Sequence, residues 1–174
     1  MARIPDSHPR KKSLESRQKI VDGSAMGLLA ESAMIAHGRG EAFDYLLGER
    51  TTSSAKGAIR ECAARLMNAR RSVISVNGNT VVLAGDGAIR LAAVIGCSIE
   101  VNLYYRTPSR VKGLISLLEE KRLKVSQEDA PEGFNGSWKD SVESVSLLGL
   151  SLIHISEPTR QEAISYAVFC LKKK

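Results

Sequence analysis

Aromatic residues and cysteines are scarce in this chain of 174 residues. Phe, Trp and Tyr together make up 5% of the sequence, too few and too scattered for the base-stacking surface of a single-strand nucleic-acid binder. The three cysteines, Cys62, Cys97 and Cys170, lack metal-ligand spacing and leave one unpaired, which argues against a disulfide scaffold or a zinc site. Long apolar runs are missing too, since none approaches the roughly 20 residues that cross a bilayer. We therefore expect a cytoplasmic protein that binds neither nucleic acid nor membranes.

Acidic residues are fewer than basic ones, and the formal net charge is +6. Much of the positive charge lies near the two ends of the chain, at Arg3, Arg10, Lys11, Lys12, Arg17 and Lys19 and in the closing lysines of residues 172–174. A basic N-terminal arm either coats a phosphate-rich ligand or forms an ordinary solvated surface. With 43% hydrophobic residues, the chain is long enough for one domain with a core.

The first 70 residues are expected to be mainly helical. A helix capped by Ser13 runs through residues 13–21, a second covers residues 25–36, and Gly23 lies at a break between them. Thr51 begins a third segment in which apolar residues recur at helical spacing.

Residues 71–149 are expected to alternate strands and helices before ending in a loop. Residues 73–76 and 98–104 predict strands, residues 87–96 predict a helix closed by glycine, and Thr107 followed by Pro108 is a strong helix start. This order indicates the α/β class, with a helical N-terminal segment followed by an open, mostly parallel, Rossmann-like sheet. From residue 122 the chain is polar and loop-like, and whether residues 141–148 form a strand stays open.

The segment from about Leu150 to the end differs in character. Residues 150–160 and 164–171 resemble a translated sequencing adapter, and the three closing lysines would be a run of adenines. On this interpretation residues 150–174 have no native fold, the authentic sequence stops near Gly149, and the chain is truncated. The alternative is an ordinary C-terminal strand and helix, because residues 150–155 alternate in polarity.

Gly38, Arg39 and Gly40 form a candidate phosphate site, where one helix is expected to end and a short one, residues 41–47, to begin. Glycines on each side allow the backbone to approach a ligand, and the guanidinium group of Arg39 matches phosphate oxygens. The free N–H groups of a new helix would add to an anion site. The alternative is an ordinary helix-loop-helix corner.

Polar residues also follow both predicted strands. Asn77, Gly78 and Asn79 come after the first, and Arg106 lies just beyond the second. Ligands of open α/β sheets bind beyond the carboxyl ends of the strands, where these groups should face the same side. Asn77 and Gly78 are equally typical of a tight turn with no ligand.

Several motifs in order carry a family resemblance. They are the segment around His8 and Arg10, then Ser13-Leu14 with Arg17, then the block around Arg39, and finally residues 74–79 and 99–107. Together they resemble the archaeal phosphopantothenate synthetases, also called 4-phosphopantoate–beta-alanine ligases, over roughly the first 110 residues.

The resemblance implies an ATP-dependent ligase of coenzyme A biosynthesis. It would condense 4-phosphopantoate with β-alanine through an acyl-adenylate, with ATP as co-substrate and Mg²⁺ bridging its phosphates, and members are homodimers. Arg17 and Arg39 fall on the family's ATP-contacting positions, while His8 and Arg10 are weaker candidates for substrate or phosphate binding. No catalytic residue and no metal ligand is implied.

Two other interpretations stay open. One is a non-catalytic basic α/β module that binds a nucleotide or nucleic acid, supported by the N-terminal charge cluster. The other is an unfolded fragment, because truncation would remove part of the core. We also expect this 174-residue chain not to turn over, since the family's remaining ATP contacts lie in a part that it lacks.

Overall fold

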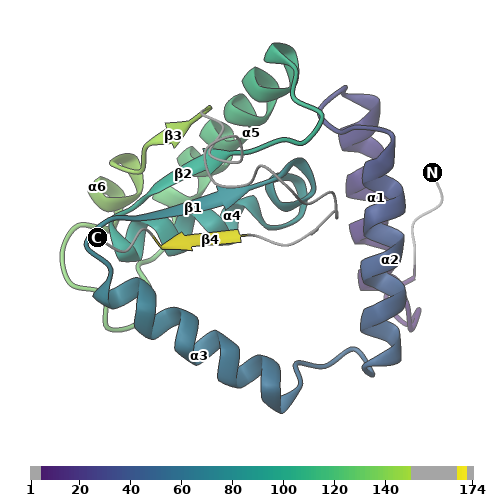
Figure 1. The fold of residues 1–174 in the computed structure, drawn as a ribbon, viewed down its shortest axis with the longest axis horizontal. Coiled ribbons are helices and arrows are strands. Elements are labelled where there is room, and N and C mark those ends of the chain that lie inside the picture. The colour runs from purple at the N-terminus through teal and green to yellow at the C-terminus, as the bar shows by residue number, and fades with distance from the viewer. Residues whose placement is uncertain (1–4, 150–167, 172–174) are drawn as a thin grey trace.

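The structure is a computed structural model that describes residues 5–149 and the backbone of residues 168–171. The elements run in the order α1 (Lys11–Ala25), α2 (Ser32–Leu46), α3 (Ser53–Asn68), β1 (Ser72–Val76), α4 (Gly78–Ile95), β2 (Ser98–Val101), α5 (Pro108–Ser126), α6 (Trp138–Glu143), β3 (Leu147–Leu148) and β4 (Val168–Leu171). The predicted α/β class with a helical N-terminal part is confirmed (Figure 1).

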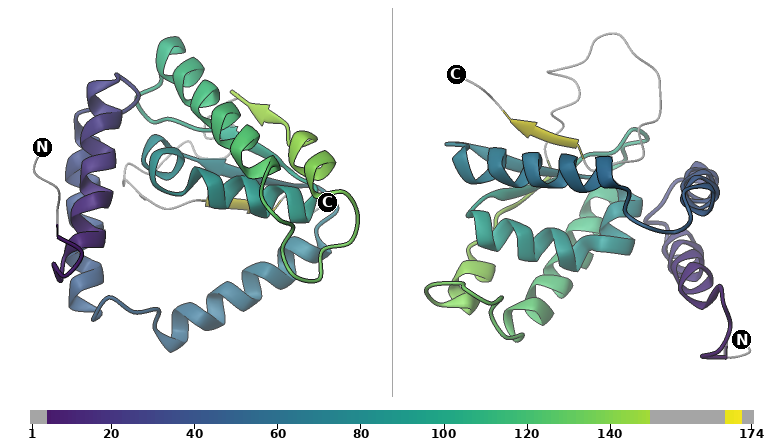
Figure 2. Two further views of the ribbon diagram at one scale, coloured as in Figure 1. Left: turned by 180° about the vertical axis from the view of Figure 1, so that it is seen from behind. Right: turned by 90° about the horizontal axis from the view of Figure 1, so that it is seen from below.

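The sheet has the strand order β3-β2-β1-β4. β1 pairs in parallel with β2, and β2 with β3, whereas β4 runs antiparallel to β1. The register sets Ile74 opposite Ile99 and Val76 opposite Val101, so these buried side chains point to one face, where α4 and α5 lie (Figures 1 and 2). The predicted strands and their parallel pairing are confirmed, although β2 ends at Val101 rather than at residue 104.

α4 ends at the predicted glycine and α5 begins at the predicted cap, but α4 begins at Gly78 rather than at the expected residue 87. Gly96 ends α4 in the left-handed conformation with φ 71°, and the Thr107 hydroxyl accepts a hydrogen bond from the Arg110 N–H at 3.3 Å. The tight turn expected at residues 77–79 is wrong, because Asn77 is the N-cap of α4, which begins directly at Gly78.

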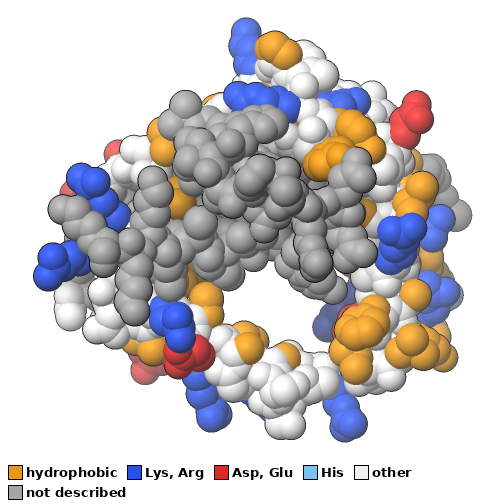
Figure 3. Space-filling model, in the orientation of Figure 1, with side chains coloured by type: hydrophobic (Ala, Val, Ile, Leu, Met, Phe, Trp, Pro, Cys, Tyr) orange, Lys and Arg blue, Asp and Glu red, His pale blue; other side chains and the backbone are white. Residues whose placement is uncertain are grey.

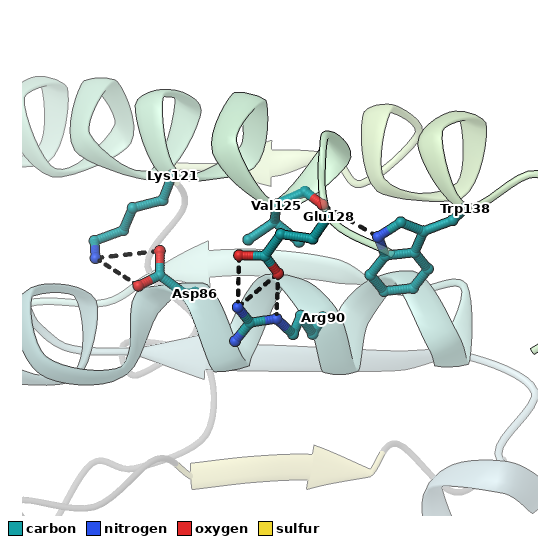
Figure 4. A network of polar contacts seen from close by, with 6 residues as sticks. All are labelled: Asp86, Arg90, Lys121, Val125, Glu128 and Trp138. Atoms are coloured by element: carbon teal, nitrogen blue, oxygen red, sulfur yellow. Dashed lines mark hydrogen bonds and ion pairs between the residues drawn. The ribbon is translucent and has the colours of Figure 1, made fainter. Parts of the chain in front are cut away.

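Polar contacts join α4 to the end of α5 and the residues just after it, and join α5 to α6 (Figure 4). Lys121 lies 3.2 Å from Asp86, and the Arg90 guanidinium group donates through two nitrogens to Glu128. The indole N–H of buried Trp138 donates to the carbonyl oxygen of Val125 at 3.1 Å. The loop expected from residue 122 onward is therefore wrong in part, since α5 continues to Ser126 and α6 follows.

Several predictions for α1 and α2 are wrong. Ser13 does not cap α1, because the helix already begins at Lys11. The expected helix over residues 25–36 is instead the end of α1, a loop of residues 26–31 and the start of α2, while Gly23 lies buried inside α1. α2 also runs without interruption through Gly38, Arg39 and Gly40, so no helix ends or begins there. Glycine weakens a helix by about 1 kcal/mol per residue, but packing of α2 against α1 supplies the compensation.

The loop of residues 26–31 supplies core side chains. They occupy the space that two glycines leave on the neighbouring helices. A Cβ atom at Gly78 would lie 2.7 Å from a Leu29 methyl, and one at Gly113 would lie 2.6 Å from a Leu28 methyl. Leu28 and Leu29 are both buried. The two glycines therefore let this loop seat the α1–α2 pair against α4 and α5.

α3 spans from the loop after α2 to the start of β1, along one edge of the molecule in Figure 1. Its start is as expected, with the Thr52 hydroxyl accepting a hydrogen bond from the Ala55 N–H. Leu66 is buried near its end, but Ile59 and Met67 are exposed.

Among the described residues, one helix, α4, is long and apolar enough to cross a membrane by length and composition alone, with a mean hydropathy of 1.3. It packs against β1, β2 and α5, and six of its residues are buried, so it is a core helix. The adapter interpretation of residues 150–174 concerns a segment that lies outside the described residues, except for the β4 backbone, and it stays a prediction.

Candidate functional site

A pocket of about 130 Å³ lies where β1 and β2 end, between the α1–α2 pair and the N-termini of α4 and α5. Three groups of residues line it: Leu28, Leu29, Ala30, Ser32, Ala33 and Ala36; Asn77, Gly78 and Asn79; Leu103, Tyr104, Tyr105 and Arg110. The carboxyl edge of a parallel sheet is where open α/β folds bind ligands. Of the residues predicted to lie at this edge, Asn77, Gly78 and Asn79 line the pocket.

Asn77 and Asn79 are each committed to a structural contact. The Asn77 carboxamide oxygen accepts a hydrogen bond from the Thr80 N–H at 2.9 Å, which caps α4. The Asn79 amide donates to the Ala33 carbonyl oxygen at 3.0 Å and so ties α4 to α2. Their predicted contact with a ligand stays a prediction, whereas their position on the pocket wall is observed.

Arg110 was not foreseen from the sequence. It lies in the first turn of α5, half-buried, and its Nη1 donates to the Tyr105 carbonyl oxygen at 3.1 Å. Beside it, Tyr104 and Tyr105 form an edge-to-face pair with ring centroids 4.9 Å apart, and both rings are exposed. A signal was available, because Arg110 follows the Thr107 cap by three residues and so had to lie at a helix N-terminus.

Arg106, the predicted cation of this edge, does not line the pocket. Its side chain donates instead to the Gly149 carbonyl oxygen. Arg110, one helical turn further, occupies the place that the sequence assigned to Arg106.

A second polar cluster joins the start of α1 to the middle of α2. Arg10 lies 2.9 Å from Glu41, and the Ser13 hydroxyl donates to the same carboxylate. The Ser13 hydrogen bond, reinforced by Arg10 and His37, holds the pKa of Glu41 below its usual value of 4.5. Arg10 is therefore largely balanced by an acid, and His8 accepts a hydrogen bond from the Arg10 backbone N–H, as a turn residue does.

This cluster makes stability depend on acid pH. A depressed carboxyl pKa contributes stability above pH 4.5 that is lost as the pH falls through the lower pKa of the folded chain. We expect Glu41→Gln to lower the free energy of unfolding at neutral pH by less than about 1 kcal/mol, since Arg10 is exposed. Urea unfolding at a series of acid pH values should show a smaller loss of stability in Glu41→Gln than in the wild type. Equal pH slopes would contradict this assignment.

Arg17 and Arg39 lie outside the pocket, exposed on α1 and α2 respectively. Glu41 faces α1, and residues two apart on a helix differ by about 200°, so Arg39 points away from α1. Gly38 and Gly40 have helical backbone, and a Cβ atom at either would meet nothing within 4 Å. Packing within the described chain therefore does not require glycine at either position, and ATP binding by the two arginines stays a prediction.

Within residues 5–149, no group of three or more His, Cys, Asp or Glu is placed to hold a metal ion. Cys97 is buried, and burial raises the pKa of its thiol, whereas Cys62 is half-buried on α3.

Known proteins resemble this chain over most of its length. Residues 54–135 match the family described as phosphopantothenate/pantothenate synthetase. A 4-phosphopantoate–beta-alanine ligase of Thermococcus onnurineus is 42% identical over 84% of this chain and 62% of its own length. The enzyme of the same name from Thermococcus kodakarensis is 41% identical with the same coverage, and that of Methanosarcina mazei is 49% identical over 68% of this chain and 47% of its own length.

The chain thus spans about half to three fifths of the length of these relatives. The family match runs from α3 through α4 and α5, so it includes Asn77–Asn79 and Arg110 of the pocket. Over residues 54–135, the chain therefore matches the phosphopantothenate/pantothenate synthetase family, and the relatives described above are ligases of one name.

Proposed function

We propose that this chain forms part of an ATP-dependent ligase that joins 4-phosphopantoate to β-alanine in coenzyme A biosynthesis. The observation that carries the proposal is the identity of 41–49% to relatives that bear this name, over a region that builds a pocket at the carboxyl edge of the sheet. The product would be 4′-phosphopantothenate, formed through an acyl-adenylate.

Such a reaction brings together two anions, a phosphorylated acid and a nucleoside triphosphate. Arginines and helix N-termini offset the repulsion between them. The described residues offer Arg110 and the first turns of α4 and α5 at the pocket, and Arg17 and Arg39 on the adjacent helices. A carboxylate is already a nucleophile, so activation of the acid by adenylation requires no general base from the chain.

Mg²⁺ would supply charge neutralisation at the phosphates. Because Mg²⁺ keeps several waters and binds few protein carboxylates in nucleotide sites, a dedicated acidic cluster is not required of residues 5–149, which contain none. Exposed Arg17 and Arg39 remain our candidates for ATP contact, and His8 and Arg10 are weaker candidates because Glu41 already balances Arg10.

The active form would be a cytoplasmic homodimer. Hydrophobic side chains gather on the surface over the C-terminal half of α2, where Phe43, Tyr45 and Leu46 are 56%, 72% and 80% exposed (Figure 3). An apolar surface of this kind is typical of subunit contacts.

ATP binding tests the proposal. Titration calorimetry with Mg-ATP should show saturable binding, and Arg39→Ala should raise the dissociation constant about 10-fold, because a charge-assisted hydrogen bond is lost. Arg60→Ala, which removes an equally exposed guanidinium group from α3, is the matched control and should have no effect.

Titration of the same protein with nucleic acid distinguishes the ligase from a nucleic-acid-binding module. Affinity for RNA or duplex DNA that falls steeply with salt, together with no ATP binding, would favour the module and contradict the ligase.

A further inference from the structure

Arg110 is the one charged residue that lines the described pocket, and no acidic side chain lies on the wall to balance it. One N–H of its guanidinium group is held by the Tyr105 carbonyl oxygen at 3.1 Å, which fixes the side chain over the loop that follows β2. The other guanidinium N–H groups donate to no described residue. A half-buried arginine fixed in this way presents its remaining guanidinium N–H groups, already oriented, to an anion.

Two helix N-termini reinforce this charge. The backbone N–H groups of Gly78 and Asn79 are the first of α4 and have no acceptor within the helix, because the intrahelical ladder begins later. α5 begins beside Arg110 itself. Both helix dipoles place their positive ends at the pocket, so an anion bound there is stabilised from three directions.

Much of the remaining wall is aliphatic, although Ser32, Asn77 and Asn79 also line it, and the volume is small. Leu28, Leu29, Ala33 and Leu103 contribute aliphatic surface, and the cavity of about 130 Å³ is well below the roughly 300–1,000 Å³ that enclose a drug-sized ligand. A whole nucleoside triphosphate is larger than the enclosed part of this pocket, which opens to solvent. A short branched acid that carries a phosphoryl group at one end and two methyl groups in its middle matches both the cationic and the aliphatic parts.

We propose that Arg110 anchors the phosphoryl group of 4-phosphopantoate in this pocket, with the dimethyl carbon of the acid packed against Leu28 and Leu29. The inference rests on the proposed ligase function and names the substrate subsite within it. Arg110 is thereby the residue that selects the phosphorylated acid over pantoate.

Calorimetric titration of the 174-residue chain with 4-phosphopantoate, pantoate and Mg-ATP tests this assignment. We expect the wild type to bind 4-phosphopantoate at least about 10-fold more tightly than pantoate, and Arg110→Gln to remove that preference. Lys112→Gln removes the same charge from an exposed position on α5 and should leave the preference intact. Thermal unfolding of each variant, followed by circular dichroism, shows whether the fold persists.

A second variant leaves the charge in place and fills the cavity. Ala36→Leu on α2 adds bulk to the pocket wall, and it should weaken 4-phosphopantoate binding while Arg110 is intact.

An unchanged preference for 4-phosphopantoate in Arg110→Gln, with binding also unchanged in Ala36→Leu, would overturn the inference. So would a loss of ATP affinity in Arg110→Gln without any loss for 4-phosphopantoate, because the pocket would then serve the nucleotide. Failure of the ligase proposal looks different, since it appears as absent or Arg39-independent ATP binding while the Arg110-dependent selection of the phosphorylated acid persists. A wild type that binds neither compound overturns both.

Discussion

Leu114→Ala is expected to lower the free energy of unfolding by about 2–5 kcal/mol. Leu114 lies on α5 with no exposed surface and forms part of the main core. Its Cδ1 atom lies 3.8 Å from the position of a Cβ atom at Gly78, so the side chain supports the floor beneath the pocket. Removal of its branched end leaves a cavity that the surrounding helices close only in part. Urea unfolding followed by far-UV circular dichroism measures the change.

Leu123→Ala is the matched control on the same helix. Leu123 is 60% exposed, so its truncation should change the free energy of unfolding by less than about 0.5 kcal/mol. If Leu114→Ala abolishes cooperative unfolding, the milder Ile89→Val, also at a fully buried site, should cost about 0.5–1.5 kcal/mol. Equal effects at positions 114 and 123, or a wild type without a cooperative transition, would contradict the core described above and favour an unfolded fragment.

Gly78→Ala is expected to destabilise the chain by about 1–3 kcal/mol through overpacking. The added methyl would lie 2.7 Å from a Leu29 methyl. Leu29 has little room to move, because its other methyl lies 3.2 Å from the Cβ position of Gly23 on α1. The loop of residues 26–31 must therefore shift, and with it one wall of the pocket.

Gly87→Ala on the same helix should change the free energy of unfolding in the opposite direction. A Cβ atom there meets nothing within 4 Å, so the better helix propensity of alanine should stabilise the chain by about 0.5–1 kcal/mol. Denaturant midpoints of the two variants should move in opposite directions. Stabilisation by Gly78→Ala would show that Leu29 does not fill the gap at Gly78.

The parts of the fold that the sequence predicted are those specified by nearest neighbours along the chain. The β-branched run of β1, the glycine after α4 and the Thr107-Pro108 start of α5 are local signals, and the structure confirms each. Because the two strands are parallel, their carboxyl ends share one edge, and this predicted in advance that Asn77 lies where the structure has a pocket.

Predictions of helix ends failed where contacts between segments far apart in the sequence determine the local structure. Gly38 and Gly40 indicate a helix end by local propensity, yet α2 continues because Glu41 contacts Ser13, and Asn79 holds the Ala33 carbonyl oxygen. Each of these contacts joins segments roughly 30–50 residues apart, which no local pattern encodes. The loop of residues 26–31 was mistaken for helix because its leucines fit helical spacing but fill gaps on α4 and α5 instead.

By itself, the amino-acid sequence determined the α/β class, the parallel order of β1 and β2 and the match to a family over residues 54–135. These follow from hydrophobic periodicity, caps and motifs that lie close together in the chain. Only the tertiary structure decided which cation faces the pocket. Arg106 and Arg110 are equally plausible in sequence, but one turn of helix separates them, and the Tyr105 carbonyl oxygen holds Arg110 at the pocket while Arg106 reaches Gly149. The direction of a side chain depends on packing between segments, and that is why the pocket became visible only in three dimensions.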